Sequence, residues 1–146
     1  MKKAIVVSVG LVTVLLSGCG HNGRPQDIRI DQYNQLQQWD AAFHGVLKTG
    51  QELSAQQDSD LQAFLRYEHN FERQTATTFP ATQMEKDAIL LLNELNLDYY
   101  VYTQSSTASN KQGFQSDLKY FDGVINGEYS THEVDKHIAT ASNSVG

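Results

Sequence analysis

The stretch TQMEKDAILLLNELNLDYYVYT, residues 82–103, decides the fold of this chain. It opens with Thr82, which is followed three residues later by Glu85, the spacing of a capping box at a helix N-terminus. Beyond this cap, apolar residues recur at intervals of three and four, and this periodicity predicts a helix with one broad buried face. The residues of that face are Met84, Ala88, Leu91, Leu92, Leu95, Tyr99 and Tyr102.

The same predicted helix has a second apolar stripe on nearly the opposite side. A helix that is apolar on two sides either is covered by neighbouring elements or keeps one side for a partner. The C-terminal segment that bears Val134 and Ile138 is the expected cover, and a partner surface is the other possibility. Aromatic residues are favoured at interfaces, so the stripe is considered together with the tyrosine beside it. The possible partner surface consists of Leu90, Leu97, Tyr100 and Val101.

Two further helices are expected before residue 82. The first covers residues 27–49 and ends at Gly50, because glycine readily adopts the backbone conformation that closes a helix. The second begins at Ser59, which has a glutamine three residues later and fits a capping box. It ends at about Phe79, since Pro80 cannot continue a helix.

Two helices are also expected after residue 103. Residues 104–111 are rich in Ser, Thr and Asn and predict a loop, and the apolar spacing that follows predicts a helix ending at Gly127. Ser130 and Glu133 then fit a capping box for a short helix. The sequence therefore predicts an all-α antiparallel bundle of about four helices plus a short C-terminal helix, over residues 27–139, with a disordered tail at 140–146.

The first residues of the chain have the layout of a secretory signal. Lys2 and Lys3 precede an uncharged apolar run, residues 4–16. A helix of this run would be about 20 Å long, which is too short for a hydrocarbon core of roughly 30 Å. A retained transmembrane anchor is therefore the weaker interpretation.

The stretch Leu16-Ser17-Gly18-Cys19 ends this run and contains the only cysteine of the chain. It resembles the lipobox of bacterial lipoproteins, in which two small residues precede an obligatory cysteine. The resemblance implies cleavage between Gly18 and Cys19, removal of a signal peptide at 1–18, and covalent lipid on Cys19. Residues 19–26 would then form the lipidated cysteine and a flexible tether. An ordinary secretory signal with an incidental cysteine is the alternative.

The charge of the chain excludes one class of function. The sequence holds 11 Lys and Arg against 17 Asp and Glu, and removal of Lys2 and Lys3 leaves nine against seventeen, a net charge of −8. Such a surface repels the phosphates of nucleic acids and anionic lipid headgroups. We therefore expect no nucleic-acid partner, and we expect the lipid to hold the protein at the membrane.

Catalytic motifs are absent from the sequence, and we expect no enzyme activity, no catalytic residue and no cofactor other than the covalent lipid. A helical bundle can bind metal through paired Glu-x-x-His motifs, but none occurs here. The candidate ligands would be Asp40, His44, Glu68 and Glu72. We expect no metal site, and we expect Glu68 instead to bond a tyrosine hydroxyl or an arginine, or to reach past the edge of the core to water.

The function that follows is a lipid-anchored protein on the extracytoplasmic side of the cell membrane. Its expected role is non-enzymatic, as a protein–protein interaction module or an envelope accessory, with a partner that the sequence does not identify. One alternative is a small-molecule carrier or sensor with a tyrosine-lined cavity. Its lining would be Tyr33, Tyr67, Tyr99, Tyr102 and Tyr120. A metal-binding bundle core is the third and weakest hypothesis.

Overall fold

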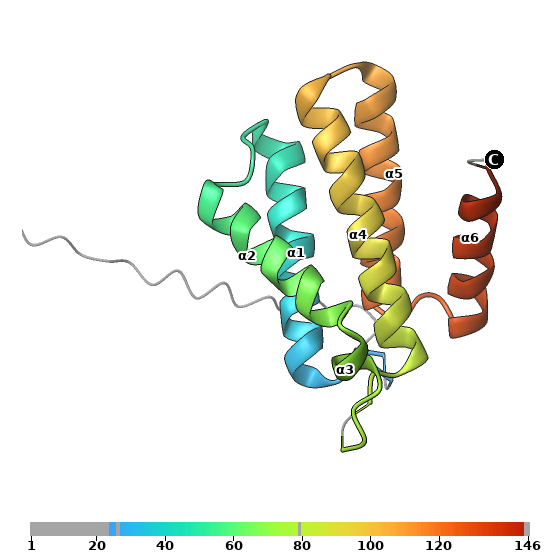
Figure 1. Cartoon of the computed structure of the whole chain (residues 1–146). Helices are drawn as coiled ribbons and strands as arrows, with labels where there is room; N and C mark the ends of the chain where they lie inside the picture. Colours follow the sequence, from blue (N-terminus) through green and yellow to red (C-terminus); the bar gives the residue numbers. More distant parts are fainter. Residues whose placement is uncertain (1–23, 26, 79, 145–146) are drawn as a thin grey trace, which may run out of the picture.

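The computed structural model describes residues 24–144 except Gln26 and Phe79, with side chains as far as Thr140. This part of the chain contains six α-helices and no strand, so the prediction of an all-α bundle is confirmed (Figure 1). The helices are α1 (Ile30–Thr49), α2 (Ala55–Glu68), α3 (Phe71–Gln74), α4 (Gln83–Gln104), α5 (Ala108–Ile125) and α6 (Thr131–Ser144).

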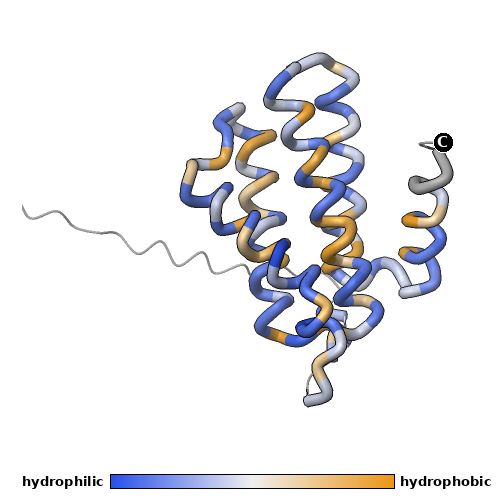
Figure 2. The backbone as a smooth tube through the Cα atoms, in the orientation of Figure 1, coloured by the Kyte–Doolittle hydropathy of each residue, from blue (hydrophilic) through white to orange (hydrophobic). Residues whose placement is uncertain are grey.

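The helices are arranged around α4 and α5, which form an antiparallel pair joined by residues 105–107 (Figure 1). Helix α1 packs against α5, and α2 and α6 lie on either side of α4. Hydrophobic residues recur along α1, α4 and α5 at intervals of about one turn (Figure 2). This is the pattern of helices that each bury one face in a shared core.

An aromatic cluster fills the centre of the core. Phe43 of α1 lies 5.4 Å from Tyr99 of α4 and 5.6 Å from Phe114 of α5, measured between ring centroids. Each such contact contributes roughly 0.5–1.5 kcal/mol beyond simple burial. The buried Tyr99 hydroxyl accepts a hydrogen bond from the backbone N–H of Leu53 at 3.0 Å, so the same ring also fixes the loop before α2.

The predicted start of α4 is confirmed in detail. The Thr82 hydroxyl accepts a hydrogen bond from the Glu85 N–H at 3.1 Å, and the Glu85 carboxylate accepts one from the Thr82 N–H at 3.1 Å. Helix α1 ends at Gly50 as predicted, with the glycine in the left-handed conformation at φ 70°. These two helix termini can be predicted from the sequence, because each depends on one or two residues at the end of the helix.

The prediction of one continuous second helix is wrong. The capping box that starts α2 is formed by Ser54 and Gln57, and Ser59 lies inside the helix. The helix ends at Glu68, and the Asn70 side chain then accepts a hydrogen bond from the Glu72 N–H at 2.7 Å. This cap starts the separate four-residue helix α3 and breaks the predicted run.

The C-terminal helices are both longer than predicted. The Thr107 hydroxyl accepts a hydrogen bond from the Asn110 N–H at 3.2 Å and caps α5, so the predicted loop at 104–111 is largely helical. The predicted capping box of α6 is confirmed, because the Glu133 carboxylate accepts from the Ser130 N–H at 2.8 Å. Helix α6 then continues to Ser144, beyond the predicted start of the tail at Thr140.

The predicted signal peptide at 1–18 lies outside the described residues, as do Gly18, Cys19 and most of the predicted tether at 19–26. Among the helices that the structure describes, none has the length and hydrophobicity needed to cross a membrane.

Candidate functional site

The second apolar stripe of α4 is exposed. Leu90, Leu97 and Val101 are 39%, 56% and 51% exposed. They extend about 16 Å along the helix, at a rise of about 1.5 Å per residue. These three residues are called the α4 face below. A row of exposed apolar side chains on one helix face makes this surface a candidate binding site.

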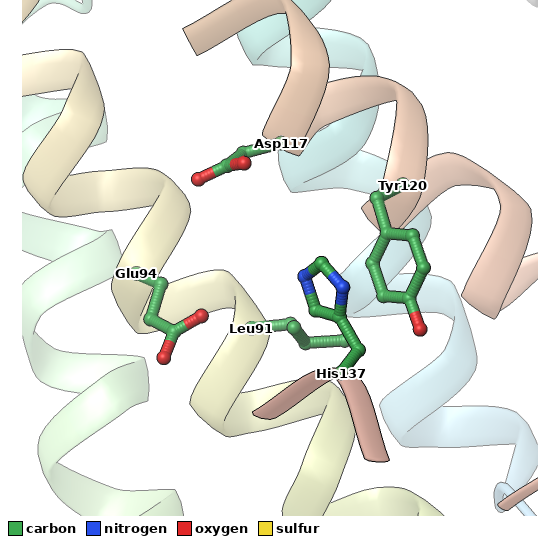
Figure 3. A pocket seen from close by; sticks show the side chains of 5 residues that line it. All are labelled: Leu91, Glu94, Asp117, Tyr120 and His137. Atoms are coloured by element: carbon green, nitrogen blue, oxygen red, sulfur yellow. The ribbon is translucent and has the colours of Figure 1, made fainter. Parts of the chain in front are cut away.

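Helix α6 packs against α4 beside the α4 face. His137 of α6 lines a small cavity together with Leu91 and Glu94 of α4 (Figure 3), and Val134 is completely buried. Leu90, Leu97 and Val101 nevertheless stay exposed with α6 in place. The expectation that the C-terminal helix covers the second stripe is therefore wrong.

Tyr100 has a structural role beside the α4 face. Its hydroxyl donates a hydrogen bond to the Asp58 carboxylate and accepts one from Gln62 Nε2 at 3.3 Å. The hydrogen bond to Asp58 and burial raise the pKa of Tyr100 to about 12. This side chain therefore joins α2 to α4, and it belongs to the predicted partner surface only at its edge.

The cavity beneath α6 brings several titratable groups together. It is lined by Leu91, Glu94, Asp117, Tyr120 and His137 (Figure 3). The Tyr120 and His137 rings stack with centroids 3.9 Å apart. Burial raises the pKa of Asp117 to about 7, and a hydrogen bond with Asp98 adds to the effect. The cavity volume is about 10 Å³, which is room for about one water molecule and not for a substrate.

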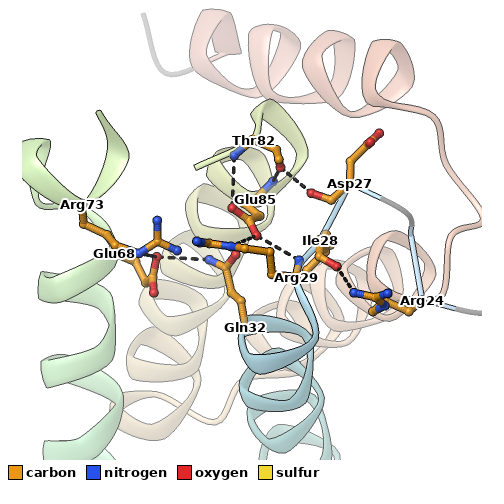
Figure 4. A network of polar contacts seen from close by, with 9 residues as sticks. All are labelled: Arg24, Asp27, Ile28, Arg29, Gln32, Glu68, Arg73, Thr82 and Glu85. Carbon is orange, nitrogen blue, oxygen red and sulfur yellow. Dashed lines mark hydrogen bonds and ion pairs between the residues drawn. The ribbon is translucent and has the colours of Figure 1, made fainter. Parts of the chain in front are cut away.

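Glu68 has an arginine partner, which is one of the three alternatives expected from the sequence. Its carboxylate lies 3.7 Å from Arg73 Nε and accepts a hydrogen bond from Gln32 Nε2 at 3.2 Å (Figure 4). Burial raises the pKa of Glu68 to about 7, although the nearby Arg29 partly opposes the shift. These contacts connect α1, α2 and α3 and account for the carboxylate on an apolar face.

The structure separates the four residues considered as metal ligands. Glu68 belongs to the network just described, and Glu72 is exposed on α3. Asp40 and His44 lie together on α1. Asp122 of α5, which is not one of the four residues considered from the sequence, lies close to both. Burial and the nearby Asp122 raise the pKa of Asp40 to about 7.

The five tyrosines of the carrier hypothesis lie in separate parts of the molecule. Tyr99 fills the core and Tyr102 stacks on Phe114, with ring centroids 5.6 Å apart. Tyr67 is 59% exposed, and Tyr120 stacks beneath α6. The fifth, Tyr33, is partly buried at the edge of the core and accepts a hydrogen bond from Gln37. Most of these rings are therefore used in packing.

No protein-family model, curated protein or solved structure matches this chain. The fold and the α4 face together define a small all-α bundle with an uncovered apolar helix surface.

Proposed function

We propose that this chain is the precursor of a membrane-anchored lipoprotein whose helical domain binds another protein on the extracytoplasmic side. The signal-like residues 1–18 and the lipobox-like Leu16-Ser17-Gly18-Cys19 support the anchor. Two acyl chains on Cys19 would hold the protein firmly, because each buried methylene contributes about 0.8 kcal/mol. The domain would then act close to the membrane surface.

The exposure of the α4 face is the observation that carries the binding role. Its residues follow each other at spacings of seven and four, and this spacing fits the apolar seam of an amphipathic helix. The net charge of −8 without Lys2 and Lys3 favours a partner with basic residues around that seam. The partner that fits best is therefore a protein that presents a basic amphipathic helix.

The cavity beneath α6 is not proposed as a catalytic site. That cavity brings Glu94 and Asp117 near His137, which is a plausible combination for acid–base chemistry. Its volume of about 10 Å³ nevertheless excludes a substrate in this conformation. The shifted pKa of Asp117 is accounted for by burial and by its contact with Asp98.

The lipid anchor is tested by mass spectrometry of the chain isolated from cell membranes. We expect a mature N-terminus at Cys19 that carries fatty acyl chains, and release of a Cys19→Ser variant from the membrane fraction. An intact leader or an unmodified thiol in the mature chain would refute the anchor.

The partner site is tested by photo-crosslinking in intact cells. A photoreactive amino acid at Leu97 is expected to capture a specific protein, and one at the exposed polar Gln56 of α2 serves as the control. The adduct at Leu97 should disappear when Leu90 is changed to Asp. Identical adducts from both positions, or an adduct that survives Leu90→Asp, would refute the α4 face as the binding site.

A further inference from the structure

A cluster of three potential metal ligands lies where α1 packs against α5. Asp40 and His44 are one helical turn apart on α1, so their side chains share a face. His44 Nε2 lies 3.7 Å from Asp40 Oδ1. Asp122 approaches from α5, and one ligand atom from each of the three residues lies within 4.8 Å of the other two. We name these three residues the α1–α5 cluster.

One carboxyl oxygen of Asp40 lies in this cluster and accepts no hydrogen bond. Its side chain is 14% exposed, and its Oδ1 atom is buried with no hydrogen-bond partner. Leaving a carboxyl oxygen buried without a hydrogen bond is costly, because the oxygen has lost its hydration and no donor replaces the water. A bound cation at this point would supply the missing interaction.

Asp122 is held in a suitable orientation by its own helix. Asn126 Nδ2 donates a hydrogen bond to Asp122 Oδ1 at 2.6 Å, which leaves the second carboxylate oxygen for another interaction. Metal-binding side chains are commonly oriented by hydrogen bonds of this kind. The contact also shows that Asp122 is not a freely rotating surface residue.

An open groove gives access to the α1–α5 cluster. His44 and Asp122 form part of its wall, and His44 is 53% exposed there. Lys48 and Lys119 also line the groove, and their charges oppose a cation. Binding must therefore depend on direct coordination by the three ligands rather than on a general negative potential.

We infer that Asp40, His44 and Asp122 bind a divalent transition-metal ion, with Zn²⁺ as the ion that suits them best. One imidazole and two carboxylates are ordinary zinc ligands, with bonds of about 2.0–2.2 Å. Neighbouring ligands of a tetrahedral zinc ion lie roughly 3.3 Å apart at such bond lengths. Side-chain rotations that close the present separations of up to 4.8 Å by about 1.5 Å would complete the site.

This site differs from the one considered from sequence, because it uses Asp122 in place of Glu68 and Glu72. Three protein ligands leave one position of a four-coordinate ion for a further ligand. It is also independent of the proposed partner site, since its residues belong to α1 and α5 and not to the α4 face.

The test is a Zn²⁺ titration of the full-length chain, purified in detergent and stripped of metal with a chelator. Isothermal calorimetry is expected to show one ion bound per chain. Asp40→Asn, His44→Gln and Asp122→Asn should each weaken the affinity at least tenfold, because loss of even an indirect supporting contact costs about 10–100-fold. Co²⁺ should give the visible absorption bands of a tetrahedral complex with the wild-type chain and lose them with each variant.

The matched control is His132→Gln, which removes an exposed histidine next to the acidic Glu133 on α6. We expect this variant to bind Zn²⁺ like the wild type, and circular dichroism should show unchanged helix content in all four variants. Zinc affinity that is equal in the wild type and the Asp40, His44 and Asp122 variants would overturn the inference. Loss of binding in His132→Gln alone would overturn it as well.

Discussion

Glu85, in the first turn of α4, accepts hydrogen bonds from both the backbone N–H and the Nε of Arg29, at 2.9 and 2.8 Å (Figure 4). The Glu85 side chain is fully buried, and burial alone would raise its pKa. The hydrogen bonds from Arg29 and Thr82 outweigh burial and hold the pKa below its ordinary value. One carboxylate thus joins the start of α1 to the start of α4.

Replacement of this carboxylate should destabilise the domain strongly. In Glu85→Gln the Arg29 side chain loses its charged partner, and we expect a loss of about 2–3 kcal/mol in the free energy of unfolding. The loss should stay below the roughly 3–5 kcal/mol of fully buried pairs, because the Arg29 side chain is 30% exposed. Urea unfolding followed by the fluorescence of Trp39, the single and buried tryptophan, measures it.

Glu133→Gln is the matched control, since Glu133 occupies the same capping-box position at the start of α6 but is exposed. Its effect on the unfolding midpoint should be much smaller. Equal effects of the two substitutions would show that the helix cap, and not the pair with Arg29, determines the stability.

Truncation of two leucines on the same helix should change stability by very different amounts. Leu92 is completely buried in the core, and Leu92→Ala should cost about 2–5 kcal/mol. Leu97 is 56% exposed, and Leu97→Ala should change stability by no more than about 0.5 kcal/mol while it weakens the proposed partner contact. Urea unfolding compares the two, and a large loss in Leu97→Ala would assign this leucine to the core.

Stability should fall as the pH rises from about 4 to about 7. Burial raises the pKa of Asp117 from 3.8 to about 7, so the folded chain keeps a proton that the unfolded chain has already released. The free energy of unfolding therefore decreases across this window, by at most about 1.4 kcal/mol per pH unit for one group before solvent screening. Asp40 and Glu68, each with a pKa of about 7, act in the same direction.

Urea midpoints measured at pH 5 and pH 7.5 check this dependence. Asp117→Asn should reduce the difference between them, because the amide cannot titrate. The exposed Asp60→Asn on α2 should leave the difference unchanged. A midpoint that rises with pH over this range in the wild type would contradict the prediction.

Two helical glycines should respond with opposite signs to alanine. A Cβ at Gly123 of α5 would lie 2.6 Å from Cε2 of Tyr129, whose ring stacks on Tyr120 and cannot easily move away. We expect Gly123→Ala to cost about 1–3 kcal/mol through overpacking. A Cβ at Gly45 of α1 meets nothing within 4 Å, so Gly45→Ala should stabilise the domain by about 0.5–1 kcal/mol. Thermal unfolding of both variants measures the signs.

The helix starts show how far the sequence could predict this fold. The cap at Thr82 was readable because a single Thr-x-x-Glu pattern precedes the apolar run. The start of α2 was ambiguous, since Ser54 and Ser59 both have a glutamine three residues later. Only the packing of the domain decides that α2 begins after Ser54.

Polar contacts between helices were harder to predict from the sequence than the helices themselves. That Glu68 needs a partner followed from its place on an apolar face, and an arginine was one of the predicted classes. The sequence does not predict that Asp122 lies beside Asp40 and His44, because the position of Asp122 depends on how α5 packs against α1. The pairing of Arg29 with Glu85 also depends on tertiary arrangement, since Arg29 precedes α1 and lies on no helix face.

If Cys19 is lipidated as proposed, the first described residues limit the distance between the domain and the bilayer. Arg24 Nη1 donates a hydrogen bond to the Ile28 carbonyl at 2.7 Å, and the Ile28 N–H donates one to the Pro25 carbonyl at 3.1 Å. The five-residue connection from a lipidated Cys19 to Arg24 could have an end-to-end length of at most about 18 Å. That length is about half the roughly 33 Å of the 22-residue α4. A docking protein would therefore meet this domain within a thin layer above the lipid, and an integral or similarly tethered neighbour could reach it more readily than a freely diffusing one.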